Sequence, residues 1–533
     1  MANKAFSRSL SVTKRLLVKQ LRPNSSKYLN RKSSNLSVRS KYRRHSSFAR
    51  ADLVENTTLI CNVENGLLKS SNLFPYFMLV AFEAGSVLRA LLLLLLYPFM
   101  CLVKTEETRL KMMVMVCFCG IRKDGFRIGA SVLPKFLLEN VGLEGFEVMK
   151  KARVVKIVGV SDMPQVMIEP FLRDYMGFDG VVGTELKVFH GYFTGLMEDK
   201  KTNDMPVDDA ASAVVGISSV NSSIDRRLVS GCDEIFLTNE SERSSWKQLP
   251  KEKYPEPLIF HDGRLAFRPT VFSCIAMFMW FPFGVLLAVV RGLIALLLPY
   301  TIAGILLAFT GMNLQLTTTN AHASAGPNSK GVLYVCNHRT LLDPLYLCFC
   351  LKKNLTAVTY SLSRLSEILA PIKTVRLTRS LSKDSKLMDQ MLTQGDLVVC
   401  PEGTTCREPY LLRFSPLFTE MSETIVPVAM DSDVSMFYGT TAGGLKCLDP
   451  IFFLMNPFPS YHVKFLDQVQ GLSSSSNPPA DGRDSRRFDV ANQVQSALGK
   501  SLNFESTKLT RKDKYLVLAG NEGVVPTKTI KSE

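Results

Sequence analysis

The amino-terminal 51 residues lack aspartate and glutamate altogether. They carry fourteen lysines and arginines, so removing this stretch from the formal net charge of +16 leaves about +2 for the remainder. A nucleic-acid-binding domain would instead place its basic residues on a folded surface with aromatic residues among them. The sequence therefore predicts no nucleic-acid partner.

The basic, Ser-rich tail at residues 1–54 has two interpretations. A segment this polar cannot bury a core, which favours a solvated, disordered arm. Alternatively, Phe6, Leu10, Leu17 and Leu21 fall on one helical face of an Arg- and Ser-rich stretch without acids, as in mitochondrial transit peptides. Mitochondrion and endoplasmic reticulum are therefore both candidate locations.

The chain also lacks the cysteine spacing of a structural zinc site. Twelve cysteines are present, but the pairs Cys117/Cys119 and Cys348/Cys350 have C-x-C spacing within apolar runs, without the C-x-x-C pattern and distant partner of a tetrahedral site. Buried cysteines in a reducing compartment explain this pattern better. We expect no metal ion.

One long apolar segment divides the chain into halves. Residues 270–311 contain a single charged residue, Arg291, and two prolines, Pro282 and Pro299. About forty residues suffice for two passes of roughly twenty residues each, or for a hairpin that enters one leaflet. We therefore expect an integral membrane protein with Arg291 near the turn, where its side chain reaches the headgroups. A buried helical pair is the alternative.

Both halves alternate β-rich runs with helical patterns, which is typical of α/β domains with parallel sheets. In residues 55–268 the runs TTLICN, ARVVKIVGVS and DGVVG predict strands, and MIEPFLRDYM predicts a helix. In residues 320–505 the runs GVLYVCNH, NLTAVTYS, DLVVCPEG and TIVPVAM predict four more strands. Residues 506–533 are expected to form a carboxy-terminal tail.

The stretch VCNHRTLLDPLYL places His338 and Asp343 five residues apart, where a strand ends and a helix begins. A carboxylate bonded to one ring nitrogen fixes the tautomer and makes the other nitrogen a better proton acceptor. The substrate most simply supplies the nucleophile, as a hydroxyl that His338 deprotonates while it attacks an activated acyl group. The alternative is a purely structural histidine at a strand end.

Two further motifs contain groups suited to an anion. In VVCPEGTTCREPYLLRF, the turn from Pro401 to Thr404 contains a glycine that permits close backbone approach, so its amides can face an anion. In APIKTVRLTRS, Arg376 and Arg379 are suited to bidentate contact with a phosphate. For both arginines, a solvated surface charge is the alternative.

The order NHRTLLD, IKTVRLTR, PEGTT and IVPVAM, over about residues 331–431, resembles the four motif blocks of the glycerolipid acyltransferases. The resemblance implies that His338 is the general base and Asp343 its orienting partner. Many relatives have arginine directly after PEGT, whereas here Thr405 follows and an arginine comes two residues later. The resemblance implies that Arg376, Glu402 and Gly403 bind the substrate, and we predict that Arg379, Thr404 and Arg407 also bind it.

The first half resembles the haloacid dehalogenase-like domain that precedes the acyltransferase domain in land-plant glycerol-3-phosphate acyltransferases, through NVENGLLKSS and GVSDMPQVMIEPFLRDYMGFDGVVG. An active phosphatase of this type begins D-x-D-G-T, and its first aspartate attacks phosphorus. Here Asn62 stands in that position, and Ser219 and Ser223 replace the expected magnesium-binding carboxylates. The resemblance therefore implies a domain without phosphatase activity.

The resemblance implies a membrane-bound enzyme that moves a fatty acyl group from acyl-CoA or acyl carrier protein to glycerol 3-phosphate. No further cofactor is expected, and the product is lysophosphatidate, for glycerolipid or for cutin- and suberin-type lipid synthesis. Within this chemistry, a lysophosphatidate acyltransferase is the alternative. A catalytically silent membrane scaffold built of two inactive enzyme domains is the alternative from another class.

Overall fold

The computed structural model describes most of the chain after the basic tail. The described residues are 43–45, 57–151, 156–198, 213–219, 232–318, 331–359, 370–377, 381–472 and 480–523. The predicted targeting helix, Arg379 and Ser223 lie outside them.

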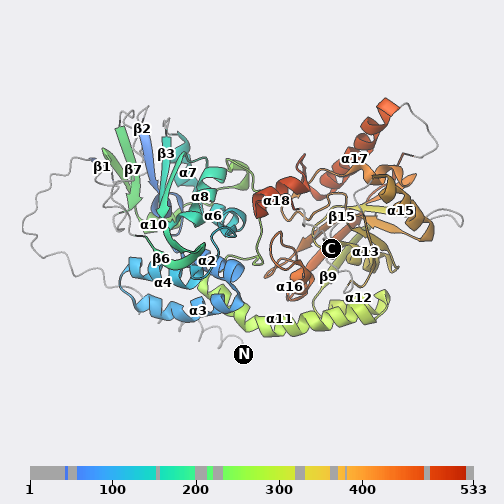
Figure 1. Ribbon diagram of the computed structural model, residues 1–533, viewed down its shortest axis with the longest axis horizontal. Helices are drawn as coiled ribbons and strands as arrows, with labels where there is room; N and C mark the ends of the chain where they lie inside the picture. Colours follow the sequence, from blue (N-terminus) through green and yellow to red (C-terminus); the bar gives the residue numbers. More distant parts are fainter. Residues whose placement is uncertain are drawn as a thin grey trace, which may run out of the picture. The chain divides into compact units, whose positions relative to one another are not determined.

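Six parallel strands form the first sheet, in the order β1-β8-β7-β2-β3-β4 (Figure 1). All six residues of the inner strand β2, TTLICN, are buried, as expected for a parallel sheet covered on both faces. The sheet confirms the strands predicted in this half. Its strands are β1 (Arg43–His45), β2 (Thr57–Asn62), β3 (Lys156–Pro164), β4 (Gly180–Thr184), β7 (Ala213–Ser219) and β8 (Glu234–Thr238).

Helices between the strands complete the first α/β domain, and a separate two-stranded hairpin consists of β5 (Leu186–Phe189) and β6 (Tyr192–Met197). The helix predicted from MIEPFLRDYM is confirmed as α8 and a following π-helical turn. The helices are α2 (Phe74–Val80), α3 (Val87–Leu102), α4 (Glu106–Phe118), α5 (Ile128–Ser131), α6 (Leu133–Leu138), α7 (Leu143–Lys151), α8 (Gln165–Pro170) and α10 (Glu240–Ser245).

The apolar segment between the halves forms two helices, α11 (Val271–Leu297) and α12 (Tyr300–Phe309), which Pro299 separates. Among the described residues, α11 alone is long and apolar enough to cross a membrane. We expected Arg291 near the turn between the helices, and this expectation was wrong. Arg291 lies inside α11, and its side chain is fully buried. It is buried because backbone carbonyls and a threonine hydroxyl surround its guanidinium group.

The second sheet is mixed, with the order β12-β11-β13-β10-β15-β16-β9 and β17 paired to β15. Strand β10 lies between β13 and β15 and is parallel to both, so the carboxyl ends of these three strands meet at one edge. All four predicted strands of this half are confirmed. The strands are β9 (Asn313–Thr318), β10 (Leu333–Cys336), β11 (Thr356–Thr359), β12 (Lys373–Arg376), β13 (Leu397–Val399), β15 (Thr424–Asp433), β16 (Ser460–Phe465) and β17 (Val469–Gln470).

The remaining elements of the second half are helices and one short strand pair. The helices are α13 (Asp343–Leu351), α15 (Leu381–Gln394), α16 (Asp449–Leu454), α17 (Ala480–Leu502) and α18 (Arg511–Ala519), and the pair consists of β14 (Tyr410–Leu411) and β18 (Glu505–Ser506).

The folded parts extend beyond three of the predicted domain boundaries. Strand β1 lies within the predicted amino-terminal tail and pairs with β8. Strand β9 begins before residue 320 and pairs with β16. Helix α18 lies in the predicted carboxy-terminal tail, yet Tyr515 and Leu518 pack in one cluster with Cys406 and Leu412. Each extension follows from pairing or packing with residues distant in the sequence.

Candidate active site

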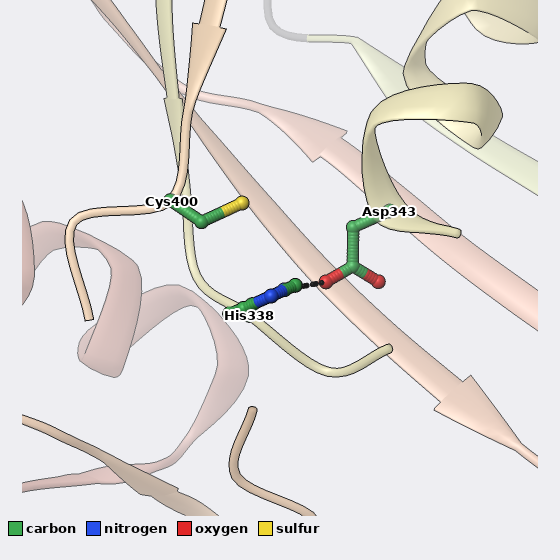
Figure 2. A group of neighbouring side chains, drawn as sticks. All are labelled: His338, Asp343 and Cys400. Atoms are coloured by element: carbon green, nitrogen blue, oxygen red, sulfur yellow. Dashed lines mark hydrogen bonds and ion pairs between the residues drawn. The ribbon is translucent and has the colours of Figure 1, made fainter. Parts of the chain in front are cut away.

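His338 and Asp343 meet at the carboxyl end of β10 (Figure 2). The His338 Nδ1 atom lies 2.9 Å from Asp343 Oδ2, and the histidine side chain is 15% exposed while the aspartate is fully buried. Asn337 sets this position, because its side-chain amide exchanges two hydrogen bonds with the Met430 backbone on β15. The spacing therefore does bring the two side chains together, because α13 begins at Asp343.

Asp343 is held by several donors in addition to the imidazole. Its oxygens accept hydrogen bonds from the Arg339 backbone amide at 2.7 Å and from the Thr340 amide at 3.1 Å. The Tyr461 hydroxyl, from β16, donates to Asp343 Oδ1, the carboxylate oxygen that does not bind the imidazole. A carboxylate with this many donors has one orientation, so it can hold the His338 ring in one tautomer.

The surroundings of His338 act on its pKa in opposite directions. Burial disfavours the charged imidazolium, but Cys400 and the Asp343 carboxylate outweigh burial and raise the pKa of His338 well above its usual value. The orienting bond to Asp343 also leaves Nε2 as the ring nitrogen that can accept a proton. The pair therefore has the composition and geometry of an oriented general base.

Glu402 links the loop that contains His338 to the segment that follows the PEGTT turn. Its Oε1 accepts from the His338 backbone amide at 2.7 Å, and its Oε2 accepts from the Leu412 amide at 2.9 Å. The residue is buried, and burial raises its pKa to about 7. Because both oxygens bind backbone amides, the contacts of Glu402 position the loops, and its predicted contact with substrate stays a prediction.

The PEGTT turn follows directly after β13. Gly403 has φ of 65° and open space where a Cβ would stand, so only a residue tolerant of the left-handed region suits this position. Thr404 is buried, and its hydroxyl accepts from Lys514 Nζ at 3.3 Å. The Thr404 side chain is thus turned toward α18, while Gly403 leaves the backbone of the turn accessible.

Two cations near this turn, the partly buried Arg339 and the buried Lys514, were not predicted from the sequence. The Arg339 guanidinium donates to the carbonyls of Cys406 and Glu408, and pairs with Asp431 at 2.9 Å. Lys514 donates to the carbonyl and hydroxyl of Thr405, and burial lowers its pKa. Arg339 lies within the NHRTLLD motif and was a detectable candidate, whereas no local signal marks Lys514, 110 residues after Thr404.

Arg407 lies beside the segment that connects the first domain to α11. Its side chain is 7% exposed, its Nη2 is 3.7 Å from Asp262 Oδ1, and its guanidinium carbon is 4.3 Å from the Tyr438 ring centroid. Neither terminal nitrogen has a hydrogen-bond partner among the described residues, and burial lowers the pKa of Arg407. Both nitrogens are closed to solvent, so the predicted contact of Arg407 with a phosphate stays a prediction.

Arg376 ends β12 at the same edge of the sheet as His338, with an exposed side chain. Three strand intervals separate β12 from β10, which is roughly 14 Å at ordinary strand spacing. The structure therefore places Arg376 on the rim of the site rather than beside the imidazole. Arg379 lies outside the described residues.

The corresponding position of the first sheet has a different set of groups. Asn62 ends β2, and its side-chain oxygen accepts from the Asn65 amide at 3.1 Å. Glu64 is buried and accepts from the Ser161 hydroxyl, and burial first, then Asp162, raise its pKa to about 7. The amide of Asn62 is no nucleophile, so the group that would attack phosphorus is missing at this strand end.

Comparison with known proteins agrees with this division into two α/β domains. Residues 58–238 match the family described as "Glycerol-3-phosphate acyltransferase RAM2-like, HAD-like domain", and residues 317–431 match the family described as "Acyltransferase". The fold class predicted from the sequence is thereby confirmed: a haloacid dehalogenase-like domain followed by an acyltransferase domain.

Whole-chain relatives identify the family. The chain is 56% identical over 486 residues to "Probable glycerol-3-phosphate acyltransferase 2" of Arabidopsis thaliana, covering 89% of this chain and 91% of the relative. It is 38% identical over 481 residues to "Glycerol-3-phosphate acyltransferase RAM2" of Petunia hybrida, covering 87% and 98%. The chain belongs to the glycerol-3-phosphate acyltransferase family.

Proposed function

We propose that this chain transfers a fatty acyl group from an acyl thioester to a hydroxyl of glycerol 3-phosphate, forming lysophosphatidate. The observation that carries the proposal is the His338–Asp343 pair, 2.9 Å apart at the carboxyl end of β10, beside the PEGTT turn. Family membership supports the acceptor and the reaction class. The acyl donor is acyl-CoA or acyl carrier protein.

In the proposed reaction the acceptor hydroxyl is the nucleophile. His338 removes its proton as the oxygen attacks the thioester carbonyl, and the tetrahedral intermediate then collapses to the ester. The departing thiolate takes the proton back from His338, so the histidine ends the cycle neutral. General-base assistance of this kind contributes on the order of a hundred- to ten-thousandfold in rate.

Basic groups and turn amides hold the phosphate in this proposal. Arg407 has two terminal nitrogens without hydrogen-bond partners among the described residues, and Gly403 allows close approach of a ligand to the turn backbone. Arg376 adds a basic group on the rim of the site, and Arg379 stays a predicted contact. The 3.7 Å pair with Asp262 means that a phosphate competes with this carboxylate for Arg407.

The apolar helices support attachment to a membrane through one leaflet. One face of α11 is buried through Cys274, Met277, Gly284, Ala288 and Arg291, and Trp280 Nε1 donates to the Met455 carbonyl at 2.8 Å. The opposite face exposes large apolar side chains, namely Phe272, Met279, Phe283, Leu286, Val289, Leu293 and Leu297. A helix held along its length by its own protein suits an in-plane position better than a span.

The missing nucleophile of the first domain supports a single product. Without an aspartate at position 62, no phosphoryl-enzyme forms, and lysophosphatidate keeps its phosphate. We expect purified enzyme given glycerol 3-phosphate and acyl-CoA to release no monoacylglycerol. Detection of monoacylglycerol in that assay would contradict this part of the proposal.

The test of the proposed function is an acyltransfer assay with microsomes that contain the chain. Glycerol 3-phosphate and lysophosphatidate are offered separately as acceptors, and the products are resolved by position of acylation. We expect acylation of glycerol 3-phosphate, and its loss in His338→Ala but not in His462→Ala, a half-exposed histidine on β16. Preference for lysophosphatidate would favour the alternative enzyme, and no turnover with either acceptor would favour a scaffold.

A further inference from the structure

Two cysteines lie beside the catalytic base although they are 64 residues apart in the sequence. Strands β10 and β13 pair in parallel with Val335 opposite Val399. Cys336, the last residue of β10, and Cys400, the residue that follows β13, are therefore also adjacent. Their sulfur atoms are 3.4 Å apart. Neither thiol forms or breaks a bond in the proposed acyltransfer.

The Cys400 thiol also faces the His338–Asp343 pair (Figure 2). A ring nitrogen of His338, a carboxylate oxygen of Asp343 and Cys400 Sγ all lie within 4.8 Å of one another. Cys336 does not belong to this group of three, but its sulfur lies 3.4 Å from Cys400 Sγ and can supply a second sulfur. One nitrogen and two sulfur atoms are a donor set that binds zinc at open sites with three protein ligands. Asp343 then acts behind the imidazole, as carboxylates behind zinc-bound histidines do.

We propose that Cys336, Cys400 and His338 form an inhibitory site for a soft divalent cation, of which zinc is the prime example. Thiolate and imidazole ligands select zinc over magnesium or calcium, which prefer oxygen. Binding occupies the nitrogen lone pair that the reaction needs, so the metal and the acceptor hydroxyl exclude one another. Two protons leave the thiols as the metal–sulfur bonds form, and no redox change takes place.

The access to the site agrees with binding from solution. His338 and Cys400 are partly exposed, whereas Cys336 is fully buried behind Cys400. Asp343 already accepts hydrogen bonds from two backbone amides and the Tyr461 hydroxyl, so it can orient the ring without becoming a ligand itself. The metal would thus enter from the substrate side.

The first experiment measures acyltransfer against zinc concentration, in a buffer with a non-thiol reductant. We expect zinc to inhibit, with inhibition reversed by a chelator. The zinc concentration for half-inhibition should rise about tenfold or more in Cys400→Ser and in Cys336→Ser, each referred to its own uninhibited rate. Cys447→Ser, which alters a partly exposed cysteine in another segment, should leave that concentration unchanged.

A second experiment does not depend on activity. Purified enzyme is titrated with Co²⁺, and we expect sulfur-to-metal charge-transfer absorbance that Cys400→Ser and Cys336→Ser each weaken. The inhibition assay rests on the proposed function, whereas the Co²⁺ titration does not. Sulfur-to-metal absorbance in an enzyme that shows no acyltransfer would refute the proposed function and support the metal site.

Three outcomes would overturn the metal site. The first is equal zinc sensitivity of wild type and both cysteine variants. The second is wild-type enzyme that shows no sulfur-to-metal absorbance. The third is inhibition that a reductant reverses and a chelator does not, which would indicate a disulfide between the adjacent thiols instead.

Discussion

The two halves of this chain end comparable inner strands in different ways, because among the described residues only the second half has a histidine held by a carboxylate at the strand end. Both sheets have an inner parallel strand that ends in a motif, β2 at Asn62 and β10 before His338. A buried glutamate lies near each strand end, Glu64 within the first motif and Glu402 in the PEGTT turn, where it accepts a hydrogen bond from the His338 backbone amide. Burial raises the pKa of both glutamates to about 7. A domain can therefore keep its fold after it has lost its catalytic group, because folding depends on burial and hydrogen bonds whereas catalysis depends on one particular atom.

The largest expected effect separates the halves directly. His338→Ala should lower acyltransfer by about a hundred- to ten-thousandfold, because it removes the general base. Asn62→Ala, at the equivalent strand end of the first domain, should leave the rate within about twofold, since Asn62 takes no part in the proposed reaction. Both variants are compared for rate and for folded fraction. A large loss of rate in a well-folded Asn62→Ala would give the first domain a direct role.

The next effect concerns the orientation of the base. Asp343→Asn keeps the side-chain shape but removes the charge that stabilises the imidazolium, so the rate should fall on the order of a hundredfold. In the wild type the raised pKa of His338 places the acidic limb of the pH–rate profile above pH 6.5, because the base must be neutral to act. We expect this limb to move to lower pH in Asp343→Asn. A limb that stays in place would mean that another group titrates.

A smaller effect tests the phosphate contact. Arg407→Ala should raise the KM for glycerol 3-phosphate about tenfold, the loss expected for one charge-assisted hydrogen bond, with kcat little changed. Arg413→Ala is the matched control, because Arg413 is an exposed arginine in the same motif. Initial rates over a range of glycerol 3-phosphate give both constants. A normal KM in Arg407→Ala would count against the contact.

The smallest expected effects are on stability, and they sharpen the comparison of the two glutamates. Burial raises the pKa of both from 4.5 to about 7. Each carboxyl therefore contributes stability that is present below pH 4.5 and lost as the pH rises through 7. The difference in free energy of unfolding between the wild type and Glu64→Gln, or Glu402→Gln, should therefore shrink by on the order of 1–3 kcal/mol between pH 5 and 8.

Thermal unfolding of wild type and both variants at several pH values measures this change. Only Glu402→Gln should also reduce acyltransfer, because Glu402 binds the His338 backbone amide. If the stability of the wild type relative to these variants rose with pH, the carboxylate form would be the stabilising one. Equal loss of activity in Glu64→Gln would remove the distinction between the halves.

Local patterns predicted the strands and the meeting of His338 with Asp343, because strand ends and helix starts are decided within a few residues. The burial of Arg291 was not predictable, since its acceptors include the carbonyls of Leu454 and Asn456, more than 160 residues away. Tyr461 and Lys514 were missed for the same reason. Arg407 was proposed from its place after the PEGTT motif, but its burial beside Asp262 depends on the path of the connecting segment.

By itself, the sequence determined the two α/β halves, the apolar segment between them, the contact of His338 with Asp343 and the absence of an aspartate at position 62. These follow from periodicity and residue type over short stretches. Only the tertiary structure decided which groups surround that base, since parallel pairing of β10 with β13 brings Cys336 and Cys400 together beside it. Strand register is set by the whole sheet, so contacts between residues 64 positions apart are invisible in any local pattern.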